Sequence, residues 1–201
     1  MQTTVSAVEL VLPPYQGIAI ADVRMVRTDQ DAAAALAALQ AMDVVGFDTE
    51  SKPTFLKGEV STGPHLVQLA TDSTAWLFQI GAQPPTDAIA HVLQVVLASP
   101  AILKVGFGLA DDVKRLRSKL GIDTVHVLDL ATAMKAKSER NSLGAKTAVA
   151  RFFGQALQKS KKITTTNWAM TRLSEKQILY AADDAHVALK LYRHWKLATA
   201  R

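Results

Sequence analysis

The order of short apolar segments along the chain is the feature that most restricts its fold. Six segments have the length and composition of strands: 23–27, 44–48, 65–70, 75–80, 102–106 and 125–130. The third and fourth are joined by the tight turn TDST, whereas the later ones are separated by helical sequence. Tight turns join antiparallel strands, but helices join parallel ones. We therefore expect an α/β domain with a mixed sheet rather than an all-parallel, doubly wound one.

Helical patterns alternate with the later strands. They cover residues 29–42, 84–98, 109–120, 129–138, 142–153 and 174–197. Gly121 is placed to end the third of these helices, and Ser174 to cap the start of the last. Since 49% of the 201 residues are hydrophobic and no low-complexity linker interrupts them, we expect one domain over 1–201. Its core should cover about 22–197, after an N-terminal extension, 1–21.

Composition bears on the cellular setting and on the partners. No apolar run approaches the roughly 18 residues that a membrane helix needs, so no membrane contact is expected. The start of the chain lacks the pattern of a signal peptide. The sequence contains no cysteine, as is usual for a cytoplasmic protein, and we expect that location. The net charge of +5 is compatible with a polyanionic partner.

Two acids share one face of the segment GFDTE. Successive side chains of a strand point to opposite faces, so Asp48 and Glu50 lie on one side and Thr49 on the other. The preceding run, 44–47, is apolar on both faces, which indicates an inner strand. Two carboxylates about 4 Å apart at an effective dielectric of about 20 repel by about 4 kcal/mol. A divalent cation would remove that repulsion; the alternative is that both acids are merely solvated.

A pair of adjacent aspartates occurs in the helix 109–120. Apolar residues at i, i+4, i+7 and i+11 form one stripe along this helix. Asp112 lies roughly 70° from the centre of the stripe, whereas Asp111 lies roughly 170° away. Asp111 is therefore expected in solvent. Asp112 borders the core, where it either bonds a backbone group or serves a site.

The closing helix contains a second such pair. Asp184 shares a flank with apolar residues and with Tyr180, one turn earlier. Asp183 belongs to a polar stripe that we expect to be solvated, together with His186, Lys190, Arg193 and His194.

Four carboxylates are thus candidates for a metal cluster: Asp48, Glu50, Asp112 and Asp184. Oxygen ligands suit Mg²⁺ or Mn²⁺. Two such ions can stabilise the attacking and the leaving oxygen of a phosphoryl displacement. A tyrosine hydroxyl beside the last acid is placed to hold the attacking water.

Three segments resemble the three motifs of the DEDDy 3′–5′ exonucleases. They are FDTE, KVGFGLADDVKRL and NWAMTRLSEKQILYAADDAHVALKLY. Within that family the chain is most similar to the ribonuclease D branch, and there to exonuclease domains of the Werner-helicase type, over about residues 22–197. The resemblance implies a ribonuclease-H-like fold: a five-stranded mixed sheet flanked by helices, with the acids at one end.

The resemblance also implies a role for each motif residue. Asp48 and Glu50 stand where the first ligands stand, and Asp48 would bridge two ions. Asp112 would reach the second ion, Asp184 is the final acid, and Tyr180 is the motif tyrosine. The implied reaction is hydrolysis of the terminal phosphodiester at a free 3′ end, which releases nucleoside 5′-monophosphates. The Werner-type likeness favours DNA slightly over RNA. It implies no nucleotide cofactor and identifies no protein partner.

Further residues are candidates for contacts with the nucleic acid. Backbone groups around Thr49 would meet the terminal sugar, and Phe55 is a candidate to stack on the terminal bases. A basic patch that precedes Trp168 consists of Lys159, Lys161 and Lys162. Such a patch with an aromatic side chain beside it can track phosphates. The alternative is a solvated loop with a tryptophan in the core.

Two other functions agree with parts of the sequence. The segment KVGFGLAD imitates a dinucleotide-binding turn, with Asp129 about twenty residues further on. That function would place the Asp111 carboxylate against a pyrophosphate and would leave the four candidate acids without a role. The more serious alternative is a catalytically inactive ribonuclease-H-like module that binds nucleic acid. Because all four acids and Tyr180 are present, an active enzyme is favoured.

Overall fold

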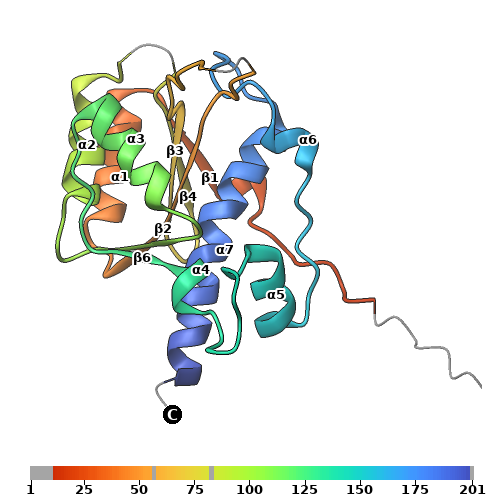
Figure 1. Ribbon diagram of the computed structural model, residues 1–201. Coiled ribbons are helices and arrows are strands. Elements are labelled where there is room, and N and C mark those ends of the chain that lie inside the picture. Colours follow the sequence, from red (N-terminus) through yellow and green to blue (C-terminus); the bar gives the residue numbers. More distant parts are fainter. Residues whose placement is uncertain (1–10, 56–57, 82–83, 200–201) are drawn as a thin grey trace, which may run out of the picture.

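Six strands form one mixed sheet in the computed structural model, which describes residues 11–55, 58–81 and 84–199 (Figure 1). The strands are β1 (Val23–Val26), β2 (Val44–Glu50), β3 (Leu66–Ala70), β4 (Ala75–Gln79), β5 (Leu103–Gly106) and β6 (Val127–Asp129). Their order is β1-β4-β3-β2-β5-β6. The pairs β2–β3 and β3–β4 are antiparallel, and the other neighbours are parallel. The prediction of an α/β fold with a mixed sheet is confirmed.

The number of strands corrects one expectation. The family resemblance implied five strands, but the described residues form six. The edge strand β1 pairs in parallel with β4, from Val23 opposite Ala75 to Val26 opposite Phe78. Val26 is fully buried, so core packing stabilises this short strand in addition to its hydrogen bonds with β4. The segment-by-segment prediction, with a strand at 23–27, is right at this point.

Helices cover both faces of the sheet. In the described residues they are α1 (Asp29–Leu39), α2 (Asp87–Leu97), α3 (Ala110–Leu120), α4 (Leu130–Ala133), α5 (Ala145–Phe153), α6 (Lys161–Thr164) and α7 (Glu175–Thr199), besides the 3-10 turn η1 (Ile20–Asp22). The first three lie on one face, and α7 crosses the other (Figure 1). No helix in this part of the chain is long and apolar enough to cross a bilayer.

The helix ends follow the local signals in most places. Gly121 ends α3 in the left-handed region, at φ 68°, as predicted. Ser174 caps α7: its hydroxyl accepts from the backbone of Gln177 at 3.3 Å, while its own N–H donates to the Gln177 side chain at 3.0 Å. The helix expected over 129–138 is only the single turn α4.

The backbones of α7 and β2 approach each other closely. A Cβ atom on Gly46 would lie 1.9 Å from the carbonyl oxygen of Ala185, so only glycine lets the helix reach the strand. Four of the fully buried side chains of α7 are alanines: Ala181, Ala182, Ala185 and Ala188. Asp48 and Glu50 follow Gly46 at spacings of two and four, so they lie on the face of β2 that α7 covers.

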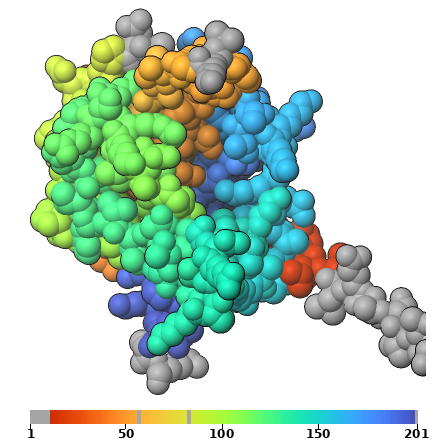
Figure 2. Space-filling view, in the orientation of Figure 1, coloured from red at the N-terminus to blue at the C-terminus, as the bar shows by residue number. Residues whose placement is uncertain are grey.

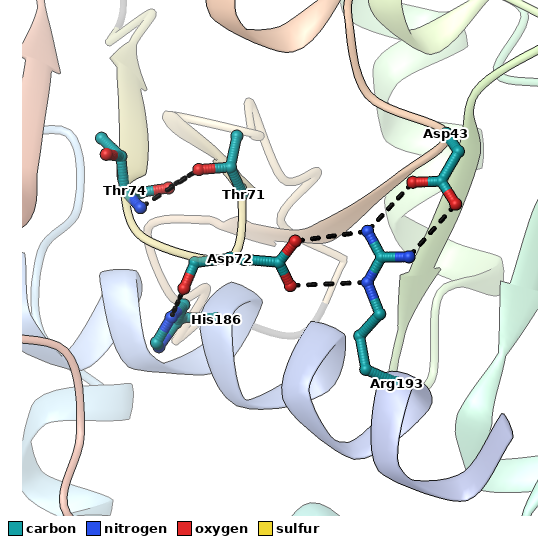
Figure 3. Close-up of polar contacts among 6 residues, drawn as sticks. All are labelled: Asp43, Thr71, Asp72, Thr74, His186 and Arg193. Carbon is teal, nitrogen blue, oxygen red and sulfur yellow. Dashed lines mark hydrogen bonds and ion pairs between the residues drawn. The ribbon is translucent and has the colours of Figure 1, made fainter. Parts of the chain in front are cut away.

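A polar network fixes the C-terminal half of α7 (Figure 3). Arg193 donates to both carboxylate oxygens of Asp43, at 3.1 and 2.9 Å, and to those of Asp72, at 3.4 and 3.3 Å. The carbonyl oxygen of Asp72 lies 3.2 Å from Nε2 of His186. A carbonyl only accepts, so Nε2 carries the proton, and burial lowers the pKa of His186. The expectation that His186 is solvated is wrong, because the β3–β4 turn covers it.

Replacing Arg193 with methionine should lower the free energy of unfolding by about 1 kcal/mol, because Asp43 and Asp72 lose their common partner. The loss stays small because the Arg193 side chain is 35% exposed and solvent screens both ion pairs. Urea unfolding at neutral pH measures it. Lys190→Met, at an exposed position of the same helix, is the matched control and should change little. Equal losses in both variants would contradict the anchoring role.

Candidate active site

Three carboxylates from two elements meet at the end of β2. One oxygen each of Asp48, Glu50 and Asp184 lies within 4.8 Å of the other two. The strand period brings the first two together, and the packing of α7 on β2 adds the third. In the space-filling view, blue atoms of α7 are visible deep between the green, orange and light-blue segments of the surface (Figure 2).

Asp112 approaches the cluster from the opposite face of β2. The residue is 7% exposed, and its carboxylate accepts a hydrogen bond from the Thr49 hydroxyl. The backbone N–H of Thr49 donates to Asp48 at 2.9 Å, so this residue links two of the acids. Asp111 is exposed and lies 3.6 Å from Lys114. The helical-face argument therefore places both aspartates of this pair correctly.

The second aspartate pair agrees with the expectation in part. Asp184 is buried, with 8% of its surface exposed, as its apolar flank predicts. Asp183 is half-buried rather than solvated, because its carboxylate accepts the Ile18 N–H at 2.7 Å. A Cβ on Gly17 would lie 2.2 Å from the same carboxylate, so the N-terminal segment crosses the helix tightly there. Helical periodicity cannot reveal a cover that comes from another part of the chain.

Lys159 lies inside the site, which the sequence did not predict. Its Nζ is 2.6 Å from Oδ1 of Asp184 and 5.7 Å from the centre of the Tyr180 ring. The Tyr180 hydroxyl is 3.0 Å from Oγ1 of Thr164, the last residue of α6. The sequence had placed Lys159 in a phosphate-tracking patch with its neighbours. No spacing signal separates it from them, because the turn into α6 decides which lysine points inward.

Burial and mutual repulsion raise the pKa values of the acids. Burial, with the charges of Asp48 and Asp184, raises the pKa of Glu50 to about 9. Burial, with the charges of Asp184 and Asp112, raises the pKa of Asp48 well above its usual range. Burial also raises the pKa of Asp184, although Lys159 acts against this rise. Burial is the largest influence on the pKa of Lys159 and lowers it, but the charge and hydrogen bond of Asp184, together with Tyr180 and Asp48, raise it by more.

The donor set fits a hard divalent cation. Asp48, Glu50 and Asp184 offer carboxylate oxygens alone, which Mg²⁺ and Mn²⁺ prefer. These oxygens are close enough to share one ion and repel one another without it. Asp112, held behind Thr49, adds a fourth carboxylate at the border of the group.

The other candidate contacts are exposed side chains outside the acid cluster. Phe55 is 79% exposed in the β2–β3 loop, and Lys161 and Lys162 are exposed on α6. The base of that loop is fixed, since His65 is buried and its Nδ1 accepts the Lys52 N–H at 3.1 Å. The exposed Phe55 side chain is thus available to a ligand.

Trp168 corrects a prediction. It is fully buried, so its ring is not available to stack on a base, and the expected contact with nucleic acid is wrong. Its Nε1 donates to the carbonyl oxygen of Thr164 at 3.4 Å, and its ring centre is 6.1 Å from that of Tyr180. The alternative, a tryptophan in the core, is right. The buried Trp168 ring lies beside the Tyr180 ring.

In the turn that resembles a dinucleotide-binding site, two backbone N–H groups already donate hydrogen bonds within the protein. The N–H groups of Gly108 and Leu109, which would hold a pyrophosphate, donate to the Asp129 carboxylate at 3.0 and 3.2 Å. Asp129 therefore fixes the turn between β5 and α3, and with it the start of the helix that carries Asp112.

The raised pKa of Glu50 predicts how stability depends on pH. Between its ordinary value of 4.5 and about 9, the folded protein keeps a proton that the unfolded chain has lost. Stability of the metal-free protein should therefore fall as pH rises through this window. Thermal unfolding in EDTA at pH 5, 7 and 9 measures the fall.

The control for this pH dependence is Glu50→Gln, whose side chain does not titrate. It should show a shallower fall and unfold at a higher temperature than the parent at pH 9. Asp111→Asn, at an exposed position, should keep the full fall. The same fall in Glu50→Gln as in the parent would contradict the assignment.

Comparisons with known proteins point to one family. A family model described as 3′–5′ exonuclease matches residues 23–198. The human exonuclease mut-7 homolog is 29% identical in an alignment of 180 positions that covers 78% of this chain and 20% of that protein. The mouse bifunctional 3′–5′ exonuclease/ATP-dependent helicase WRN is 30% identical over 154 residues, 75% of this chain and 11% of that protein. The chain thus spans a fifth or less of these relatives' length.

The crystal structure of Trypanosoma brucei RNase D in complex with RNA U12 has the same fold. It matches with a TM-score of 0.75 at 23% identity, over 86% of this chain and 61% of that one. The sheet and its helices are therefore those of the ribonuclease-H-like exonucleases. With a family match over residues 23–198 and an acid cluster at the end of β2, the chain belongs to the 3′–5′ exonuclease family.

Proposed function

We propose that this domain removes nucleotides one at a time from the 3′ end of a nucleic acid and releases nucleoside 5′-monophosphates. One observation carries the proposal: three carboxylates, buried Glu50 and Asp184 and part-buried Asp48, converge within 4.8 Å beside the Tyr180 side chain. A purely structural cluster would be unfavourable, since buried like charges destabilise a fold unless a cation joins them.

Two divalent ions, Mg²⁺ or Mn²⁺, complete the proposed site. Asp48, Glu50 and Asp184 would hold them, with Asp48 shared between the two and Asp112 reaching the second. Bound there, the ions would stabilise the attacking and the leaving oxygen of the displacement.

Tyr180 is the residue that we assign to the attacking water. Burial and the charge of Asp184 raise the pKa of Tyr180 to about 12, so the hydroxyl keeps its proton at neutral pH. A protonated hydroxyl can donate and accept hydrogen bonds, and so can orient a water without competing as a nucleophile. Thr164 and the buried Trp168 hold the ring and the hydroxyl in place.

Exposed side chains outside the acid cluster supply the proposed contacts with the rest of the nucleic-acid strand. Phe55 would stack on the terminal bases, and Lys161 and Lys162 would lie along the phosphates. Backbone groups around Thr49 would meet the terminal sugar. DNA is the proposed preference, on the Werner-type likeness. The RNase D structure with bound RNA makes RNA the necessary comparison.

An assay with end-labelled strands tests the proposal. A 5′-labelled oligonucleotide should shorten stepwise with Mg²⁺ or Mn²⁺, whereas a 3′-labelled one should release labelled mononucleotide at once. EDTA should stop both. Matched DNA and RNA, each single-stranded and recessed, give the substrate preference. Binding without shortening under either ion would instead identify the domain as an inactive nucleic-acid-binding module.

Each aspartate pair provides its own matched control. Asp184→Asn and Asp112→Asn should each lower the cleavage rate more than about 100-fold, since each removes a charge that would face the ions. Asp183→Asn should leave the rate nearly intact because the amide oxygen still accepts the Ile18 N–H. Asp111→Asn, in solvent, should do the same. Initial rates on the preferred strand measure both contrasts, and equal effects within a pair would contradict the assignment.

A further inference from the structure

We propose that Lys159 is an internal cation which competes with the metal for Asp184 and leaves it for the substrate phosphate. Metal loading would thereby be coupled to substrate binding. The proposal rests on the proposed function and concerns the regulation of that same site.

The position of Lys159 is the first argument. Its Nζ lies 2.6 Å from Oδ1 of Asp184, a residue whose carboxylate is also part of the three-acid group. Only 28% of the Lys159 side chain is exposed, so this ion pair is screened less than one on the surface. The ammonium also lies over the Tyr180 ring, at 5.7 Å from its centre, where a cation is attracted.

Competition follows from charge and space. An ammonium and a divalent ion that both bind the Asp184 carboxylate repel each other inside a poorly screened site. Metal binding must therefore weaken or break the pair between Lys159 and Asp184. Until then the lysine partly neutralises the buried Asp184 carboxylate.

A released ammonium needs a new anion. Two divalent ions carry as much positive charge as the four ionised acids carry negative charge, so the charge of Lys159 would be left over. One phosphodiester group balances it. Lysine has a flexible stem and binds phosphate as a point charge, so a small rotation could transfer it from carboxylate to phosphate. The chain is held behind it, because Lys146 Nζ donates to the carbonyl oxygen of Lys159 at 3.2 Å.

The first test is a titration with Mn²⁺ without nucleic acid, in which free Mn²⁺ is followed by electron paramagnetic resonance. Lys159→Met should bind Mn²⁺ on the order of tenfold more tightly than the parent, a change typical of coupling between sites. Lys161→Met makes the same change of charge two residues away, at an exposed position without a contact to Asp184, and should bind Mn²⁺ like the parent.

The second test adds a nucleoside 5′-monophosphate, the product class, as the phosphate probe. It should strengthen Mn²⁺ binding more in the parent than in Lys159→Met, because only the parent gains a partner for the ammonium. Direct contact between phosphate and metal is common to both and cancels in the comparison. If the methionine variant does not fold, Lys159→Gln, which keeps a hydrogen-bond donor but no charge, should show the same two changes.

The outcomes separate this inference from the proposed function. A parent protein that binds no Mn²⁺ would contradict both. A parent that binds Mn²⁺ and cleaves, together with a Lys159→Met variant of equal or weaker Mn²⁺ affinity, would overturn the competition alone. An equal gain from the monophosphate in both proteins would overturn the transfer of Lys159 to phosphate.

Discussion

The contact between α7 and β2 is the constraint on which the acid site depends. At Gly46 the helix backbone lies so near the strand that no side chain fits between them. Asp48 and Glu50 are on that same face of the strand, and Asp184 directly precedes the residue whose carbonyl oxygen faces Gly46. A bulkier interface would move the helix outward and separate the acid on α7 from those on β2. The buried alanines of α7 therefore serve the chemistry as much as the packing.

The same contact brings carboxylates close together, and other groups of the protein offset their repulsion only in part. Asp48 and Glu50 are brought together with Asp184 in poorly solvated surroundings, and their pKa values rise. The Thr49 N–H and Lys159 each stabilise one carboxylate, but one ammonium does not balance the group. Apolar residues in these positions would give a more stable fold. An arrangement that lowers stability in this way is typical of a functional site.

Local periodicity was sufficient for the residues whose environment is set by their own helix or strand. It placed Asp48 with Glu50, chose Asp112 over Asp111, and buried Asp184. It failed where another part of the chain determines the environment of a side chain. The N-terminal segment covers Asp183, and the β3–β4 turn covers His186. The chain leading into α6 directs Lys159 toward Asp184. For Trp168 the sequence left a contact with nucleic acid and a position in the core both open, because a one-dimensional pattern does not show whether a tryptophan points to solvent or into the core.

The helix that carries Tyr180 and Asp184 is fixed at both ends. The capping box between Ser174 and Gln177 sets its start, and Arg193 binds its other half to Asp43, just before β2, and to the β3–β4 turn. Between these points the helix backbone lies against β2 at Gly46. Any rearrangement as ions and substrate enter must therefore come from side chains on less constrained segments. Lys159, which enters from the loop before α6, is the charged group of the site that is best placed to move.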